Sequence, residues 1–486
     1  MASLEELRHT RLEKLKKLEK AGMKAYPSRV PRDLSLSEVV RDFEKLSKEG
    51  KEVSLAGRVM ALRAQGGLTF LNFTDGTAAF QALLKEGDTR EDARTLFAET
   101  VDIGDFISLT GTLFITKRGE KTLQVKDWTM AAKALLPLPE KWHGITDPEE
   151  RYRLRYLDLL MNPELREMFE RKAKFWSVTR RFLNDHGFLE VETPTLEVTT
   201  GGAEARPFRT HHNDFNLDVY LRISVGELWQ KRLMAGGFPK TFEIGRAYRN
   251  EGTSPEHLQE FTNMELYLAY ANAEDGMKLV QSLYRTIAKG VYGKTKFLSR
   301  GLEFDLADEW EHVDYVTKVK ELTGIDILSA SEKEMQKKLK ELNVEYEGKS
   351  RERLADTLWK YCRKKIAGPA FLTGHPVVVA PLSKADAKRP GTVEMFCPIL
   401  AGSEVGKGYS ELNDPLDQRK RFEEQQKLLE AGDEEAMMPD WSFVEMLEHG
   451  MPPTCGFGVG ERLFATLEGK PIRETQLFPL LRLKQG

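Results

Sequence analysis

Hydrophobic and polar residues follow two different periods along this chain, and the change of period divides it into regions. Residues 4–20 (LEELRHTRLEKLKKLEK) carry leucines at intervals of three to five positions among charged residues. This spacing is typical of an amphipathic helix with a dense polar face. Two interpretations of that face stay open: a solvated surface, or an arm that rests on an RNA backbone.

From residue 52 to about 133 the period shortens to two, as in strands. The apolar runs are separated by turn signals at Gly66-Gly67, Asp75-Gly76 and Arg118-Gly119. About five short strands, with no helix of comparable length between them, predict a small closed barrel of the OB type. Barrels of this type often bind single-stranded nucleic acid. Phe70, Phe73 and Phe80 could stack on bases there or fill the core.

The remaining pattern predicts a larger α+β domain after a linker. Residues 135–153 hold three prolines followed by polar residues, which makes them the best linker candidate. We expect helices at 164–186 and 227–236, and strands at 188–196 (ended by Pro194), 219–224, 240–249 and 261–270. The expected domains are an N-terminal helical extension (1–50), an OB barrel (51–136), a linker (137–150) and an α+β domain (151–486) with a helical Lys/Glu-rich insertion at about 311–365.

Composition excludes several classes of protein. The 486 residues carry a formal net charge of −3, so nucleic acid could be attracted only by a local basic patch. Cys362, Cys397 and Cys455 form no CxxC pair, which argues against a disulfide framework and a cysteine zinc site. The sequence has neither an apolar run of membrane-spanning length nor the apolar core of a signal peptide, so we expect a cytoplasmic protein with no membrane partner.

The densest candidate chemistry lies at 247–267 (AYRNEGTSPEHLQEFTNMELY). If the two flanking strands pair, alternation brings Arg249 and Glu251 to the same face as Glu265 and Tyr267. The forked guanidinium of an arginine suits a phosphate or a carboxylate. An exposed hairpin held by salt bridges is an equally open interpretation at this point.

Two further stretches carry charged residues beside glycines. In GSEVGKGYSELNDP (402–415), Glu404 and Glu411 could hold Mg²⁺ or pair with an ammonium group, although paired acids are common on surfaces. In the segment 455–482 a glycine-rich run precedes a helix that begins at Glu461-Arg462, an arrangement suited to anions. It matches neither the Rossmann nor the P-loop fingerprint.

These stretches together resemble a known family. GFLEVETPTL, FEIGRAYRNEG…EFTNMELY and GFGVGERL…IRETQLFP are similar, in this order, to motifs 1, 2 and 3 of class II aminoacyl-tRNA synthetases. GYSELNDPLDQRKRF and GGAEARPFRTHHN resemble the lysine-specific branch, from which the chain departs enough to suggest a divergent member. The resemblance covers nearly the whole chain. It implies an antiparallel sheet flanked by helices, an anticodon-binding OB barrel and a homodimer formed through motif 1 around Pro194.

The implied activity has two steps: lysine attacks the α-phosphate of ATP, and the tRNA(Lys) terminal hydroxyl then takes the lysyl group. In the family, Arg249 would contact the α-phosphate and the substrate carboxylate, and with Arg462 it would act in catalysis. Glu251 would read the adenine amino group, and Phe261 would stack on the ring. The implied ATP-binding residues are Arg249, Glu251, His257, Phe261, Glu404 and Arg462, with Glu404 also holding Mg²⁺.

The resemblance also implies a pocket for L-lysine and an anticodon site. Because lysine presents two ammonium groups, its pocket needs fixed carboxylates. The implied lysine-binding residues are Gly202, Glu227, Arg249, Glu265, Tyr267, Lys407, Tyr409 and Glu411. The implied anticodon contacts are Phe70, Gln81 and Asp127, where Asp127 replaces a usual glutamate.

Departures from the family pattern leave other functions open. Cys397 stands where a second metal-binding acid is usual, for which Glu394 could substitute, and Lys407 replaces an asparagine. ISVGEL is one residue longer than usual, and GFGVGERL is one shorter. The alternatives to a working lysine-specific synthetase are a catalytically impaired paralogue that binds RNA or regulates, and an enzyme that lysylates proteins. Synthetase-like enzymes that lysylate proteins typically lack the barrel.

Overall fold

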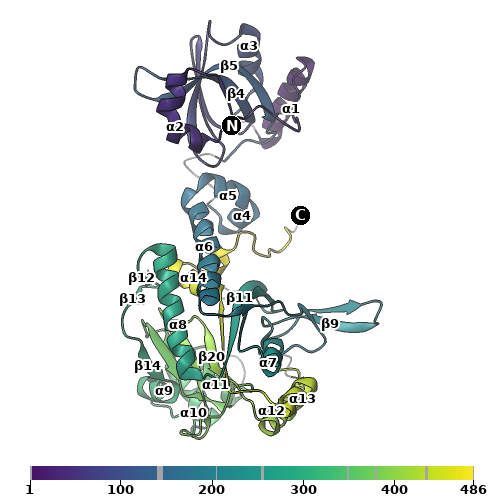
Figure 1. Ribbon diagram of the computed structural model, residues 1–486, viewed down its shortest axis with the longest axis vertical. Coiled ribbons are helices and arrows are strands. Elements are labelled where there is room, and N and C mark those ends of the chain that lie inside the picture. The colour runs from purple at the N-terminus through teal and green to yellow at the C-terminus, as the bar shows by residue number, and fades with distance from the viewer. Residues whose placement is uncertain are drawn as a thin grey trace. The chain divides into compact units, whose positions relative to one another are not determined.

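The computed structural model describes residues 3–139, 146–203, 205–252, 257–346, 350–377, 380–432 and 436–484. The chain folds into two compact units, Met1–Asp147 and Pro148–Gly486 (Figure 1). Each unit buries its own apolar core.

The N-terminal unit is a closed five-stranded barrel, which confirms the expected OB fold. Its strands follow the order β1-β2-β3-β5-β4 around the barrel. They are β1 (Val53–Gln65), β2 (Leu68–Thr74), β3 (Ala79–Lys85), β4 (Phe106–Ile115) and β5 (Lys121–Ala132). The helices are α1 (Leu4–Lys20), α2 (Leu36–Glu49) and α3 (Glu91–Thr100).

Helix α1 has the predicted bounds, because a capping box starts it: Ser3 and Glu6 exchange side-chain and backbone hydrogen bonds. Helix α3, between β3 and β4, was not expected from the sequence. Two of the three candidate stacking rings are core instead. Phe73 is fully buried, and Phe80 packs 6.2 Å from the ring of Phe43, so only the half-buried Phe70 stays available to a ligand.

The C-terminal unit is built on a nine-stranded, mostly antiparallel sheet, as expected for the fold class. The order is β14-β15-β18-β20-β21-β11-β10-β6, with β19 paired to β18. These strands are β6 (Leu189–Glu190), β10 (Lys240–Tyr248), β11 (Glu260–Ala269), β14 (Glu311–Asp314), β15 (Ala370–Thr373), β18 (Met395–Leu400), β19 (Ser403–Glu404), β20 (Lys407–Ser410) and β21 (Thr454–Gly460). Smaller sheets contain β7 (Leu196–Glu197), β8 (Arg209–His212), β9 (Leu217–Leu221), β12 (Lys296–Ser299), β13 (Leu302–Asp305), β16 (His375–Pro376) and β17 (Thr392–Val393).

Helices cover both faces of the large sheet, and alternation along each strand divides its side chains between two cores. On one face Val280 and Tyr284 of α8 pack with Phe457 of β21, and α8 runs along the sheet in Figure 1. On the other face, Tyr267 of β11 packs with residues of α7, α11 and α13. The helices are α4 (Pro148–Arg153), α5 (Arg155–Met161), α6 (Pro163–Asp185), α7 (Glu227–Ala235), α8 (Ala273–Ile287), α9 (Tyr315–Thr323), α10 (Glu332–Glu341), α11 (Arg351–Arg363), α12 (Pro415–Glu430), α13 (Trp441–His449) and α14 (Glu461–Glu468).

Two expectations from the sequence need correction. The strand predicted at 188–196 is reduced to the two-residue strands β6 and β7, because Thr193 gives its backbone N–H to Glu243 at 3.0 Å and Pro194 has none to give. The region 311–365 is not helical throughout. It begins with β14, which pairs in parallel with β15 as an edge strand of the main sheet.

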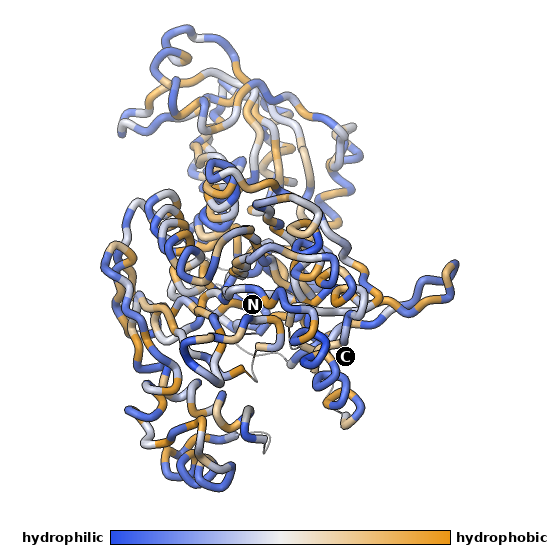
Figure 2. The backbone as a smooth tube through the Cα atoms, turned by 60° about the horizontal axis from the view of Figure 1, so that its bottom comes forward, coloured by the Kyte–Doolittle hydropathy of each residue, from blue (hydrophilic) through white to orange (hydrophobic). Residues whose placement is uncertain are grey.

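The described helices include none that is both long and apolar enough to cross a membrane. Figure 2 shows hydrophilic and hydrophobic residues alternating within the helices rather than gathering in long apolar runs. This agrees with the amphipathic pattern of the sequence.

Candidate functional site

A strand of glycines forms the floor of the candidate site. In β21 the residues at alternate positions 456, 458 and 460 are all glycine. The neighbouring strands β20 and β11 present large polar side chains on the same face, because directly opposed residues in an antiparallel sheet share a face. The two opposed rows, from β20 through β21 to β11, are Tyr409–Gly456–Tyr267 and Lys407–Gly458–Glu265.

Glycine is required on this floor because the flanking side chains converge above it. A Cβ on Gly456 would clash with Glu411 Oε1 and would stand 2.7 Å from Tyr267 Cε1. A Cβ on Gly458 would stand 3.3 Å from Glu265 Cγ. The missing side chains leave a cavity of about 300 Å³.

All the residues of the C-terminal unit that the sequence analysis assigns to ATP or lysine binding line this one cavity. The set comes from β11, β19, β20, α7, α14 and the loops between them. It comprises Gly202, Glu227, Arg249, Glu251, His257, Phe261, Glu265, Tyr267, Glu404, Lys407, Tyr409, Glu411 and Arg462.

Three buried carboxylates form an acidic wall: Glu227, Glu265 and Glu411 are 5%, 6% and 2% exposed. Burial raises the pKa of Glu411 to about 8, although nearby Lys231 lowers it. Burial and the charge of Glu227 raise the pKa of Glu265 to about 7. Glu411 and Glu265 therefore bind protons near neutral pH unless a cationic ligand displaces those protons.

Hydroxyl and amide donors orient this acidic wall. The Tyr409 hydroxyl donates to Glu227 Oε1, and the Tyr267 hydroxyl donates to Glu265 Oε2 at 3.2 Å. The other oxygen of Glu265 accepts from Asn263 Nδ2 at 3.0 Å and from the backbone N–H of Val225 at 2.7 Å. These partners hold the carboxylates in place before any ligand arrives.

Two glycines with positive φ bring the chain close to Glu227. Gly226 (φ 72°) precedes α7, and a Cβ there would stand 2.8 Å from Thr193 Cγ2. Gly202 (φ 89°) packs on Glu227 so closely that a Cβ would lie 2.6 Å from its Oε2. Only glycine fits both requirements. Within ISVGEL, Gly226 therefore stands directly before helix α7.

On the cationic side of the cavity, Arg249 follows β10 and is held by the hairpin. Its backbone N–H donates to Gln259 O at 2.8 Å, and its Nε donates to Ile223 O at 3.3 Å. The guanidinium carbon stands 5.2 Å from the ring centre of Phe261. Burial lowers the pKa of Arg249, but a guanidinium keeps its charge at any physiological pH.

Helix α14 brings Arg462 and Glu404 together. Arg462 Nη1 donates to the backbone carbonyl of Glu404 at 3.4 Å. Trp359 of α11 donates its indole N–H to Glu404 Oε1 at 2.5 Å. The helical region that showed little chemistry in the sequence therefore supports a carboxylate of the site.

Glu404 by itself offers a metal ion only one free carboxylate oxygen. Its Oε1 is engaged by Trp359, which leaves Oε2 to reach a cation. Cys397 is buried, and burial raises the pKa of its thiol far above the usual range, so it offers no hard anionic ligand. Glu394, the suggested substitute, is not among the described residues that line the cavity. Within the described ranges, no group of three His, Cys, Asp or Glu side chains is placed to hold a metal ion.

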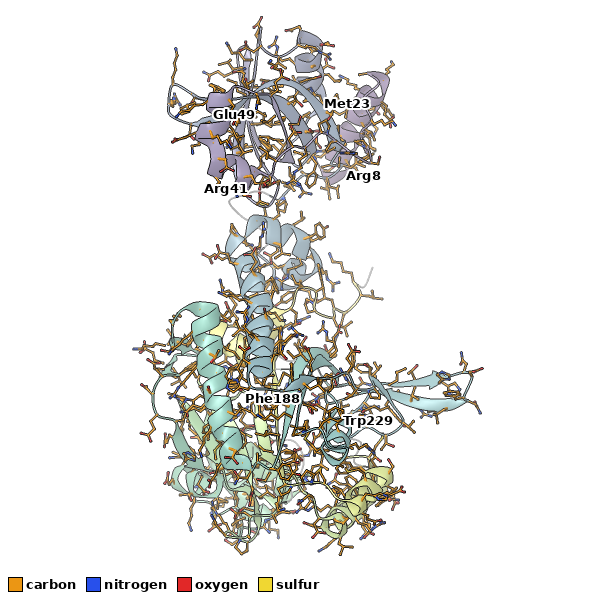
Figure 3. The ribbon with its side chains drawn as sticks, in the orientation of Figure 1. Arg8, Met23, Arg41, Glu49, Phe188 and Trp229 are labelled. Atoms are coloured by element: carbon orange, nitrogen blue, oxygen red, sulfur yellow. The ribbon has the colours of Figure 1, made fainter. Side chains whose placement is uncertain are left out.

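Sequence reasoning missed Lys231, whose ammonium lies 2.9 Å from Glu227 Oε1 and 2.5 Å from Glu411 Oε2. The available signal was its spacing of four residues after Glu227 on a helix, which places both side chains on one face. Sequence reasoning also missed Glu197, on the other side of α7. It accepts a hydrogen bond from Trp229 at 2.9 Å, and burial raises its pKa to about 7 (Trp229 is labelled in Figure 3).

The candidate anticodon residues lie on three neighbouring strands of the barrel, β2, β3 and β5. Phe70 and Gln81 share the outer face, because Gln81 lies opposite Asn72, two residues from Phe70. Gln81 donates to Thr122 Oγ1 at 2.8 Å. Asp127 is exposed and accepts from the backbone N–H of Trp128 at 2.9 Å.

Comparison with known proteins assigns this fold and cavity to a family. The profile described as "tRNA synthetases class II (D, K and N)" matches residues 147–482, and "OB-fold nucleic acid binding domain" matches residues 53–131. The chain therefore belongs to the class II aminoacyl-tRNA synthetases of the aspartate, lysine and asparagine group.

Within this group, the chain is similar over its full length to proteins named lysine–tRNA ligase. It is 43% identical to that of Thermotoga maritima, with 99% of this chain and 97% of the relative covered. It is 44% identical to that of Roseiflexus sp. strain RS-1, with 99% of each chain covered. A third, from Thermoanaerobacter sp., is 42% identical over 99% of this chain and 97% of its own length.

Proposed function

We propose that this protein is a lysine–tRNA ligase, which activates L-lysine with ATP and transfers it to tRNA(Lys). One observation carries the proposal: the acidic wall of Glu227, Glu265 and Glu411 lines the same cavity as Arg249 and Arg462. An amino acid with two ammonium groups suits the first side, and a triphosphate suits the second. Full-length similarity to lysine–tRNA ligases supports the same assignment.

In the activation step, a carboxylate oxygen of lysine attacks the α-phosphorus of ATP, and the bond to pyrophosphate breaks. Arg249 is suited to bind both the lysine carboxylate and the α-phosphate, because its fork can reach two oxyanions at once. Arg462 and His257 bind the departing phosphates. Catalysis here consists of holding the reactants together and offsetting phosphate charge.

The adenine end of ATP binds between Phe261 and Glu251 in this proposal. The guanidinium of Arg249 lies near the ring of Phe261, with its central carbon 5.2 Å from the ring centre. The purine stacks on the ring, and Glu251 accepts from the adenine amino group.

The lysine substrate lies along Tyr409, with its ammonium groups against the acidic wall. Glu411 and Tyr267 receive the ε-ammonium, while Glu265, Glu227 and the Gly202 carbonyl receive the α-ammonium. When bound, Mg²⁺ held by Glu404 and the ATP phosphates neutralises charge on the phosphate oxygens. Lys407, exposed at the edge of the cavity, is placed to meet the substrate carboxylate or a phosphate.

In the second step, a terminal ribose hydroxyl of the tRNA attacks the lysyl carbonyl and AMP leaves. Phe70, Gln81 and Asp127 read the anticodon, with Phe70 stacking on a base. The enzyme acts in the cytoplasm as a homodimer joined through the segment around Pro194. Leu189, Leu196 and Val198, which flank that proline, are 49%, 50% and 59% exposed, which favours a covered surface.

Lysine-dependent exchange of pyrophosphate into ATP tests the activation step, and charging of a tRNA with a UUU anticodon tests the transfer step. We expect both with lysine, and neither with aspartate or asparagine. Exchange with aspartate but not lysine would refute the proposed pocket. Absence of exchange with every amino acid, together with retained tRNA binding, would favour the impaired paralogue.

The dimer is tested by light scattering of the Leu196→Asp variant. We expect this variant to be a monomer.

A further inference from the structure

Lys231 is a fully buried cation whose role the proposed reaction does not use. Its side chain is 1% exposed, and its ammonium bridges Glu227 (2.9 Å) and Glu411 (2.5 Å). The aromatic rings of Tyr409 and Phe443 stand 5.4 and 5.8 Å from it. A lysine buried this deeply is rare unless its partners hold it charged.

The ammonium of Lys231 contacts two carboxylates of the acidic wall. Glu227 and Glu411 both line the cavity, whereas Lys231 is not part of its described lining. The two carboxylates therefore contact an internal ammonium and also border the space that a ligand would occupy. Glu411 Oε2 meets Lys231 as an ion pair without an aligned hydrogen bond.

Lys231 changes the net charge of the amino-acid pocket. When all of these groups are ionised, the three carboxylates of the wall and the single ammonium of Lys231 leave two net negative charges. Zwitterionic lysine brings two ammonium groups and one carboxylate, and Arg249 is present for the carboxylate. With Lys231 the site becomes neutral when lysine binds, and without it one buried negative charge would remain unmatched, which is costly in a low-dielectric interior.

We propose that Lys231 is a positioning residue that sets the charge of the amino-acid pocket to two net negative charges, and so makes it complementary to a doubly cationic amino acid. The inference rests on the proposed function, because it assigns the cavity to lysine. It adds a specificity-determining residue that never touches the substrate.

The protonation of the surrounding groups agrees with this role. Burial lowers the pKa of Lys231, but Glu227 and Glu411 offset this so that the pKa is raised overall and the ammonium persists. Lys231 in turn lowers the pKa of Glu411, which burial and the other acids raise. The titratable groups around the pair are Glu227 on α7, Glu411 and Tyr409 at β20, Glu265 and Tyr267 on β11, and Cys455 on β21.

Loss of the internal ammonium would raise the pKa of Glu411 further, so that this carboxyl would hold its proton more tightly at neutral pH. Lysine would then have to displace that proton. The KM for lysine would rise at neutral pH and recover in alkaline solution. A merely structural role for Lys231 would lower thermal stability without moving this pH dependence.

The test compares full-length variants in lysine-dependent pyrophosphate exchange between pH 6 and 8.5. For Lys231→Met we expect the curve of KM for lysine against pH to shift to higher pH by about one unit, which is roughly a tenfold rise in KM at pH 7. The KM for ATP should stay within about twofold of the wild-type value, since the phosphate side is untouched. Lys231→Arg keeps the charge and should keep the wild-type curve.

The matched control is Lys133→Met in the N-terminal unit. Lys133 is also fully buried between two carboxylates, Asp102 at 2.6 Å and Asp105 at 2.8 Å. Its loss should lower the melting temperature without moving the pH curve for lysine. If Lys231→Met does not fold, Lys231→Gln, which is neutral but still donates hydrogen bonds, must show the alkaline shift.

The outcomes separate the two proposals. If the wild-type protein shows no lysine-dependent exchange, the proposed function fails. If the wild type is active but the neutral Lys231 variants keep its pH curve, only the role of Lys231 is refuted. A shift in Lys231→Arg as large as in Lys231→Met would also refute it, because charge would then not be the cause.

Discussion

At the scale of single residues, the site works by holding charges of one sign close together before the ligand arrives. Glu227, Glu265 and Glu411 would repel one another in isolation, and they are kept in place by tyrosine hydroxyls, an asparagine and one internal lysine. Arg249 and Arg462 add cations to the lining of the same cavity. The contribution of each residue to the site therefore depends on the charge that it supplies and on the partners that fix its position.

Arg249 is the residue whose loss should be most severe. Arg249→Ala removes the cation that is proposed to bind both the substrate carboxylate and the α-phosphate, so we expect exchange activity to fall by at least about 10²–10³-fold. The control is Arg246→Ala, because Arg246 is exposed on the preceding strand and does not line the described cavity. Near-normal exchange in Arg249→Ala would refute its assigned role.

The raised pKa values of the acidic wall predict a pH-dependent affinity for lysine. Glu411 and Glu265, with pKa values of about 8 and about 7, take up protons as the pH falls through these values, and a protonated carboxyl attracts an ammonium less. Lysine should therefore bind more weakly at pH 6 than at pH 7.5, and binding at pH 7 should release protons. Calorimetry in buffers of different ionisation enthalpy measures this release, and an absence of buffer dependence at pH 7 would contradict it.

At the scale of elements, the cavity exists because one strand has no side chains on the face that its neighbours fill. β21 lies between β11 and β20 and presents glycine at three alternate positions. Helices then bring the remaining groups: α7 carries Glu227, α14 carries Arg462, and α11 supports Glu404 through Trp359. The site is therefore a product of register as much as of residue type.

Substitutions in β21 test this role of the strand. In Gly456→Ala the new methyl group would clash with Glu411 and Tyr267, and overpacking of this kind costs about 1–3 kcal/mol, so the KM for lysine should rise by about tenfold or more. Gly458→Ala, with its nearest neighbour at 3.3 Å, should have a smaller effect. An equal effect in both variants, measured by exchange kinetics, would show that the glycines serve another purpose.

At the scale of the whole molecule, two units with separate cores divide the work of the proposed reaction. The barrel carries the candidate anticodon residues, and the C-terminal unit contains the complete cavity. Because neither core includes residues of the other unit, damage to one surface should leave the chemistry of the other intact.

A substitution on the barrel should therefore separate the two steps. Phe70→Ala should leave lysine-dependent exchange unchanged while it weakens tRNA binding, since one stacked base contributes about 1–3 kcal/mol, or roughly 5- to 150-fold. Phe106→Ala is the control, because Phe106 is also partly exposed but lies on β4. Equal charging kinetics for wild type and Phe70→Ala would remove Phe70 from the anticodon site.

The sequence by itself determined the fold class, the bounds of α1 and the membership of the cavity. Period-two alternation and turn residues are local properties, and family motifs mark residues whose types the reaction requires. Every residue inferred for ATP or lysine binding lines the one cavity. The sequence did not predict helix α3 or strand β14, because the conformation of a short element depends on what it packs against.

Only the tertiary structure decided which charges meet. Residues 231 and 411 are far apart in the chain, and nothing local in either segment indicates that Lys231 faces Glu411 at 2.5 Å. The same holds for Trp359 and Glu404, and for the burial of Phe73 and Phe80. Pairing, burial and pKa depend on distances between segments, which the order of residues encodes only through the completed fold.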